Sequence, residues 1–137
     1  MAETKHTYLA FGEKHADTYK KLGELLGKLT NRDQFLLALS WGFQSGTNVE
    51  DFKRSGNGVR VDYLKDEDRA LISAIHLAET CEPESLSDVD AGFTLAEQYA
   101  EGGILLLAQV MEEHGDFSRK LSGQVKSQLD ALAFDEQ

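Results

Sequence analysis

The chain has 137 residues, a formal net charge of −10 and 41% hydrophobic residues, which predicts one folded, acidic domain rather than a disordered segment. The apolar run at residues 104–108 is far shorter than the roughly 20 residues that a membrane-spanning helix needs. The charged N-terminus lacks the apolar region of a signal peptide, and the single cysteine, Cys81, excludes an internal disulfide, so we expect a cytoplasmic protein.

We expect a single domain over residues 1–137, in which residues 1–11 form a flexible or extended arm. A first helix is predicted over residues 13–29, because Tyr19, Leu22, Leu25, Leu26 and Leu29 fall at helical spacing on one side.

The segment Asp33–Phe43 (DQFLLALSWGF) is apolar on every side of a helical wheel, which predicts a central helix covered by the others. Asn31 with Gln34 predicts a capping pair at its start, and Gly46 predicts its end. Trp41, the only tryptophan, is interpreted as a core residue or as an interface anchor.

A small basic β-hairpin is predicted between the second and third helices. Asn57-Gly58 is a strong two-residue turn signal, with strands expected at Val49–Phe52 and Val59–Tyr63. This segment is either an ordinary charged turn or a wing that contacts DNA phosphates. The residues predicted to bind DNA are Lys53, Arg54, Arg60 and Lys65.

Three more helices are predicted. Residues 66–68 open the third helix with carboxylates, and Glu82-Pro83 ends it. Ser87 and Asp90 predict the start of the fourth, in which Gly102-Gly103 indicates either a kink or, as we favour, a tight helix crossing. A fifth is expected from about residue 117 to 134, so the predicted fold is a mainly α bundle of about five helices with a small hairpin.

No catalytic, phosphate-binding or zinc motif appears in the sequence, so we predict no enzyme, no cofactor and no metal site. His76, Glu79 and Cys81 lie close in sequence, but a metal would need a further ligand from elsewhere. A partly buried, hydrogen-bonded histidine is the commoner role for such a residue.

The negative charge is confined to one part of the chain. Residues 70–118 hold ten Asp or Glu and no Lys or Arg, whereas the other 14 acidic residues are matched by the 14 Lys and Arg. Three interpretations of this block stay open, namely a solvated face, a docking surface for a basic partner and an imitation of a nucleic-acid backbone. The residues predicted to bind a partner are Glu79, Glu82, Glu84, Asp88, Asp90, Glu97, Glu101, Glu112 and Glu113.

Two stretches together carry a family resemblance. They are DQFLLALSWGFQSG at residues 33–46 and EDRALISAIHLAET at residues 67–80, the second followed by LSDVDAG and AEQYAEGGILLL. Their order over residues 15–110 resembles the small DNA phosphorothioation (dnd) system-associated protein 4 family, although Glu101-Gly102 replaces the family's usual Asn-Gly. The resemblance implies bacterial or archaeal defence against foreign DNA, in a supporting rather than catalytic role.

We therefore expect a non-catalytic adaptor of a DNA-modification or restriction-type anti-phage system. Its acidic block would dock on a basic protein subunit, and its basic hairpin would lie near DNA. Two other classes stay open, namely a free-standing helical DNA-binding regulator and an acidic inhibitor that imitates DNA.

Overall fold

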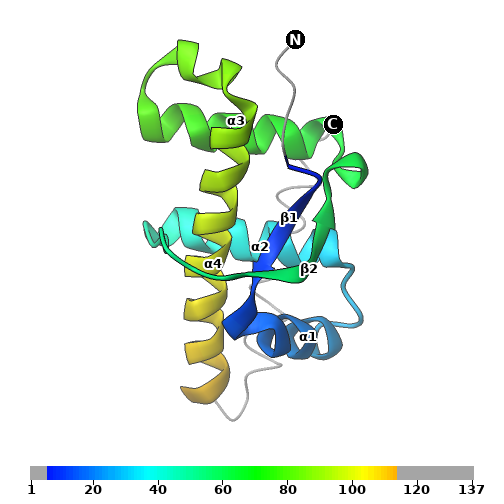
Figure 1. Cartoon of the computed structure of the whole chain (residues 1–137). Coiled ribbons are helices and arrows are strands. Elements are labelled where there is room, and N and C mark those ends of the chain that lie inside the picture. Colours follow the sequence, from blue (N-terminus) through cyan, green and yellow to red (C-terminus); the bar gives the residue numbers. More distant parts are fainter. Residues whose placement is uncertain (1–5, 114–137) are drawn as a thin grey trace.

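The computed structural model describes residues 6–113 (Figure 1). In chain order its main elements are β1 (Tyr8–Gly12), α1 (Ala16–Leu25), α2 (Asn31–Ser45), β2 (Arg54–Arg60), α3 (Asp66–Thr80) and α4 (Val89–Glu113). Short 3-10 helices η1 (Glu13–His15), η2 (Val61–Tyr63) and η3 (Pro83–Ser87) lie between them. The mainly helical class is confirmed, whereas the helix predicted over residues 117–134 lies outside the described residues.

Helix α2 is the central helix, as predicted. Its residues 34–39 are all buried, and Trp41 is half-buried against the core. Gly46 ends it in the left-handed conformation, with φ of 66°. The predicted cap was wrong by one residue, because the Thr30 hydroxyl, not Asn31, accepts the Asp33 amide hydrogen bond at 3.2 Å.

Helices α2 and α4 cross at a contact between glycines. A Cβ on Gly42 would overlap the carbonyl oxygen of Tyr99, and one on Gly103 would overlap that of Ala38. Only residues without a side chain allow two helix backbones to approach so closely. Helix α4 continues through Gly102 and Gly103, so the predicted crossing is confirmed and the kink is not seen (Figure 1).

The predicted β-hairpin is wrong. The small sheet pairs β1 with β2 in antiparallel register, with Tyr8 opposite Arg60 and Ala10 opposite Gly58. Asn57-Gly58 lies inside β2 rather than in a turn, and a Cβ on Gly58 would overlap the Leu9 carbonyl oxygen. The glycine therefore permits close pairing with a strand from the distant N-terminal arm.

Of the segments predicted as hairpin strands, only residues 59 and 60 lie in a strand, at the end of β2. Residues 49–52 form a loop, tied to α4 by a hydrogen bond from the Val49 amide to the Gln98 carbonyl at 3.0 Å. Residues 61–63 form η2. Residues 8–12, for which the sequence left a flexible or an extended arm open, form a strand in which Leu9, Ala10 and Phe11 are buried.

A partly buried ion pair joins α2 to α3. The Arg32 guanidinium donates to both carboxylate oxygens of Asp68, at 2.7 and 2.8 Å, and Asp68 also accepts from the Lys65 amide at the start of α3. Such two-pronged pairs fix geometry as well as adding energy. None of the described helices is both long and apolar enough to cross a membrane.

Candidate functional site

Three carboxylates on α4 face the N-terminal segment of the chain. Asp90, Glu97 and Glu101 are spaced seven and four residues apart, which places them on one side of the helix. Glu97 and Glu101 are only 3% and 4% exposed. Both carboxylates are turned toward the N-terminal segment rather than to bulk solvent, and their role in partner docking stays a prediction.

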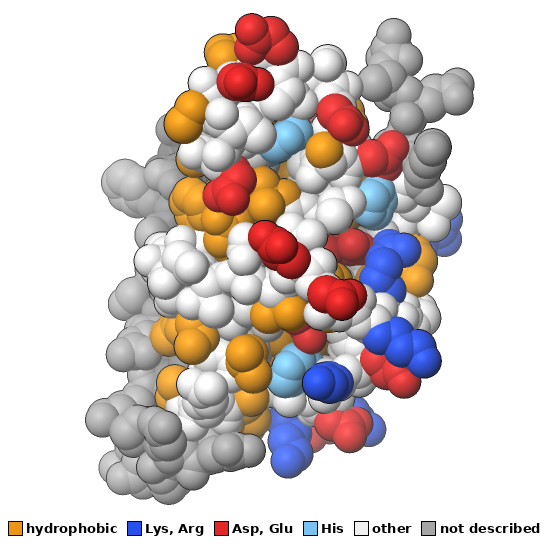
Figure 2. All heavy atoms as spheres, turned by 60° about the vertical axis from the view of Figure 1, so that its left-hand side comes forward, with side chains coloured by type: hydrophobic (Ala, Val, Ile, Leu, Met, Phe, Trp, Pro, Cys, Tyr) orange, Lys and Arg blue, Asp and Glu red, His pale blue; other side chains and the backbone are white. Residues whose placement is uncertain are grey.

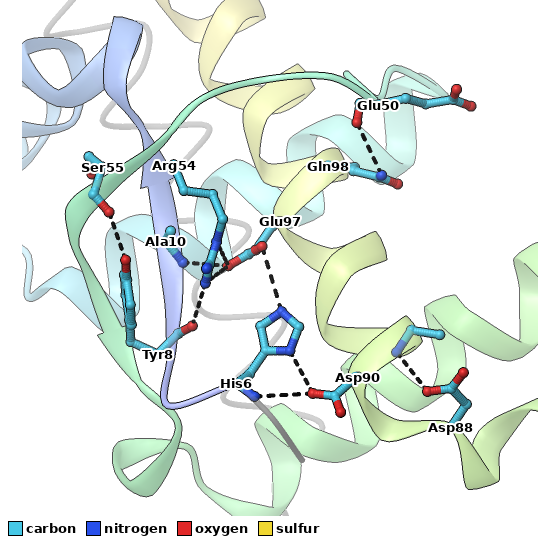
Figure 3. Close-up of polar contacts among 11 residues, drawn as sticks. His6, Tyr8, Ala10, Glu50, Arg54, Ser55, Asp88, Asp90, Glu97 and Gln98 are labelled. Atoms are coloured by element: carbon cyan, nitrogen blue, oxygen red, sulfur yellow. Dashed lines mark hydrogen bonds and ion pairs between the residues drawn. The ribbon is translucent and has the colours of Figure 1, made fainter.

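Glu97 binds both strands of the sheet (Figure 3). Its Oε2 atom accepts from the Ala10 amide at 2.6 Å and from the Arg54 guanidinium at 2.9 and 3.2 Å. Arg54 also donates to the Tyr8 carbonyl at 3.1 Å and lies over the Tyr8 ring. Arg54 thus joins the small sheet to α4, while its role in DNA binding stays a prediction.

Asp90 holds the segment that leads into β1. Its Oδ1 atom accepts from the His6 amide at 3.1 Å and lies 2.7 Å from the ring Nδ1 of His6 (Figure 3). The other ring nitrogen of His6 lies 3.8 Å from Glu97. The carboxylates of α4 therefore bind the chain from His6 to Ala10, an arrangement that a count of surface charge could not predict.

Glu101 lies at the far end of β1, beside Gly12 and His15. Gly12 donates a backbone hydrogen bond to the carboxyl group, which occupies the space that a Cβ on Gly12 would need. Burial raises the pKa of Glu101, opposed by this hydrogen bond and by the charge of Lys14. Burial, followed by Lys14, lowers the pKa of His15, whose Nε2 lies 3.6 Å from Glu101. Both shifts favour the neutral forms.

A pocket of about 510 Å³ opens beside this pair. It lies between η1, the loop before β2 and α4. Sequence spacing could not connect His15 with Glu101, because the two residues come from segments far apart in the chain. The one local signal was Gly12, which directly precedes the charged residues 13–15. The lining residues are Glu13, Lys14, His15, Val49, Asp51, Phe52, Lys53, Glu101 and Leu105.

Four of the predicted partner-binding residues gather where α3 turns into α4. We name Glu79, Glu82, Glu84 and Asp88 the acidic end; all four are exposed. In Figure 2 acidic side chains extend from the top of the molecule to its lower right, whereas the Lys and Arg visible on this face lie only toward the right and lower right.

Two members of the acidic end also act within the fold. Glu79 accepts a hydrogen bond from the Tyr99 hydroxyl at 2.7 Å. Burial, together with this hydrogen bond and charge, raises the pKa of Tyr99 to about 12. Asp88 accepts from the Ala91 amide in the first turn of α4. Glu112 and Glu113 end α4, and their side chains lie outside the described part of the chain.

The predicted DNA-binding residues do not form one patch. Lys53 and Arg60 lie at opposite ends of β2, and Lys53 is 3.4 Å from Glu13. Arg60 lies over the Tyr63 ring and 3.6 Å from Asp62. Lys65 is exposed just before α3. Arg60 and Lys65, on either side of η2, are thus separate from Lys53.

Within residues 6–113, no three His, Cys, Asp or Glu side chains are grouped so that they could hold a metal ion. His76 is 5% exposed, and its ring lies against Gly92, where a Cβ would be 3.0 Å from Nδ1. In the described part of the chain, the His76 ring is therefore packed inside the fold against α4.

Comparison with known proteins identifies one family. The family model described as DNA sulphur modification system-associated protein 4 matches residues 12–136. Comparison with curated proteins and with solved structures yields no significant match. Since the family match covers most of the chain, including α1 to α4, the protein belongs to the DNA sulphur modification system-associated protein 4 family.

Proposed function

We propose that this protein is a non-catalytic adaptor that docks on a basic subunit of a DNA sulphur modification system. The family description supports an association with such a system and names an associated protein rather than an enzyme. DNA sulphur modification is the phosphorothioation of DNA, and this family supports a link to the defence that depends on it. The observation that carries the proposal is the acidic end, where four carboxylates are exposed on a stretch without Lys or Arg.

We propose a smaller docking surface than the full set of acidic residues in this part of the chain. Glu97 and Glu101 face β1, and Asp90 is bound to His6, so our proposal does not rely on these three. Glu82 and Glu84 remain exposed on η3 and its flank. Complementary charge of this kind sets the orientation and speed of association more than its strength.

A double charge reversal tests the docking surface. We expect Glu82→Lys with Glu84→Lys to keep the fold, because both side chains are exposed, and to lose the partner in a tagged pull-down from the native host. The readout is the amount of basic DNA sulphur modification protein recovered, identified by mass spectrometry.

The matched control is Glu24→Lys with Glu50→Lys, which changes net charge equally at two exposed sites away from the acidic end. Equal recovery by both double variants would contradict the docking surface. Recovery of DNA without any protein would instead favour the free-standing regulator.

A contact with DNA is the second part of the proposal. Arg60 and Lys65 are exposed on either side of η2 and can bind phosphates, with Lys53 further along the sheet. We expect Arg60→Glu with Lys65→Glu to weaken DNA retention by the assembled complex and to reduce its salt dependence. Filter binding at two salt concentrations measures both effects. Lys20→Glu with Lys21→Glu, on the exposed side of α1, is the control, and an equal loss there would contradict a specific contact.

A further inference from the structure

The pocket beside Glu101 and His15 lies apart from the acidic end. Asp88 precedes Glu101 by 13 residues, a separation of about 20 Å along a helix. The pocket volume of about 510 Å³ lies within the range of small-molecule sites in proteins. The docking proposal assigns no role to this pocket.

The pocket is lined at its buried side by an imidazole and a carboxyl group that are within ion-pair distance but are not hydrogen-bonded to each other. His15 Nε2 and Glu101 Oε1 are 3.6 Å apart, beyond hydrogen-bonding distance. The Glu101 side chain is 5% exposed, and Gly12 supplies one backbone donor to its carboxyl group. A carboxylate accepts several hydrogen bonds, so Glu101 and the imidazole can both bind a third group placed between them.

The rest of the lining divides into an apolar part and a charged part. Val49, Phe52 and Leu105 supply the apolar surface, and Leu105 is 37% exposed although large and apolar. The Phe52 ring offers a stacking surface for a flat ring, and aromatic side chains stack on every kind of nucleic-acid base.

The charged part of the lining contains Lys14 and Lys53, both exposed. Lys53 is 3.4 Å from Glu13, but both side chains are more than half exposed, and such pairs contribute little energy. An anionic group of a ligand can therefore displace the Glu13 carboxylate from the Lys53 ammonium group. Asp51, also exposed on the lining, is an acceptor for a hydroxyl group.

We propose that this pocket binds a nucleotide. The amino group of the base donates to Glu101, a second polar atom of the base bonds to His15, the ring packs on Phe52, and the phosphate lies between Lys14 and Lys53. Glutamate is a regular acceptor for the cytosine amino group. Thymine has no such group, so the pocket discriminates against it. The ligand is a free nucleotide or an unpaired nucleotide of a DNA strand, which share this chemistry.

A titration of the whole chain tests the proposal. The probes are dCMP, dAMP, dTMP and a short single-stranded oligodeoxycytidylate, followed by calorimetry or amide chemical shifts. We expect dCMP to bind about 10-fold more tightly than dTMP, the factor that one hydrogen bond supplies. Binding of the mononucleotides identifies a free nucleotide as ligand, whereas binding of the oligonucleotide alone identifies a nucleotide within a strand.

Two variants test the assigned contacts. Lys14→Gln with Lys53→Gln alters exposed side chains, so the fold remains, and should weaken binding of the probe about 10-fold. Lys20→Gln with Lys21→Gln makes the same charge change on α1, outside this pocket, and should have no effect. Glu101→Gln should remove the preference for dCMP over dTMP, because the Gln amide group can donate to the thymine O4 atom as well as accept from the cytosine amino group.

The proposal is overturned if neither the mononucleotides nor the oligonucleotide bind. It is also overturned if dTMP binds as tightly as dCMP and Lys14→Gln with Lys53→Gln binds like the wild type. Either result leaves the adaptor proposal standing, because that rests on Glu82 and Glu84 and is read in a separate pull-down.

Discussion

Replacing Gly103 with alanine lowers the free energy of unfolding by about 3 kcal/mol, the upper part of the usual range for overpacking a core. A Cβ at this position would overlap the Ala38 carbonyl oxygen and lie 2.8 Å from the Gly42 amide nitrogen. These atoms belong to the backbone of α2, so no side chain can rotate away. The two helices must separate, and the core between them loses contacts.

Urea denaturation of Gly103→Ala measures this change. Gly56→Ala is the matched control, because a Cβ on Gly56 has no neighbour within 4 Å and its backbone conformation suits other residues. We expect the control to stay within about 0.5 kcal/mol of the wild type. Similar stability of Gly103→Ala and Gly56→Ala would contradict the close helix crossing.

Replacing Glu97 with alanine should also cost about 3 kcal/mol of unfolding free energy, the upper end for leaving a buried donor without its acceptor. The Ala10 amide and the Arg54 guanidinium both lose their acceptor. Arg54 is 42% exposed and can turn to water, whereas Ala10 is 2% exposed and leaves a buried donor unpaired.

The Glu97→Ala variant separates a structural role from a docking role. Thermal and urea unfolding should show the loss, whereas Glu24→Ala, at an exposed position on α1, should be nearly neutral. Under conditions in which Glu97→Ala is still folded, it should recover the partner as the wild type does. A fully stable variant that loses the partner would return Glu97 to the docking surface.

The elements that the sequence predicted correctly are those with a local signal. The all-round apolar character of residues 33–43 identified α2 as central, and the paired glycines near residue 102 indicated the helix crossing. Both signals depend on residues close together in the chain. The end of α2 at Gly46 followed from the same kind of evidence.

The features that could not be predicted from the sequence depend on contacts between distant segments. Asn57-Gly58 is a turn signal when the neighbouring strands pair with each other, but the partner of β2 is β1, almost 50 residues earlier. The buried carboxylates had a weak signal, because Glu97 and Glu101 interrupt the buried apolar side of α4 between Phe93 and Ile104. A carboxylate within such a stripe indicates a partner inside the protein. Only the fold identifies that partner, which is Arg54 for Glu97 and Gly12 for Glu101.

The central claim is that the acidic end binds a basic subunit, and a salt series on the purified pair tests it most directly. The dissociation constant of the wild-type chain for the co-purified DNA sulphur modification protein should rise with salt concentration. For Glu82→Lys with Glu84→Lys, binding at low salt should be weaker and its salt dependence smaller, whereas Glu24→Lys with Glu50→Lys should follow the wild type. A dissociation constant that changes with neither salt nor the Glu82 and Glu84 reversals would contradict the adaptor proposal.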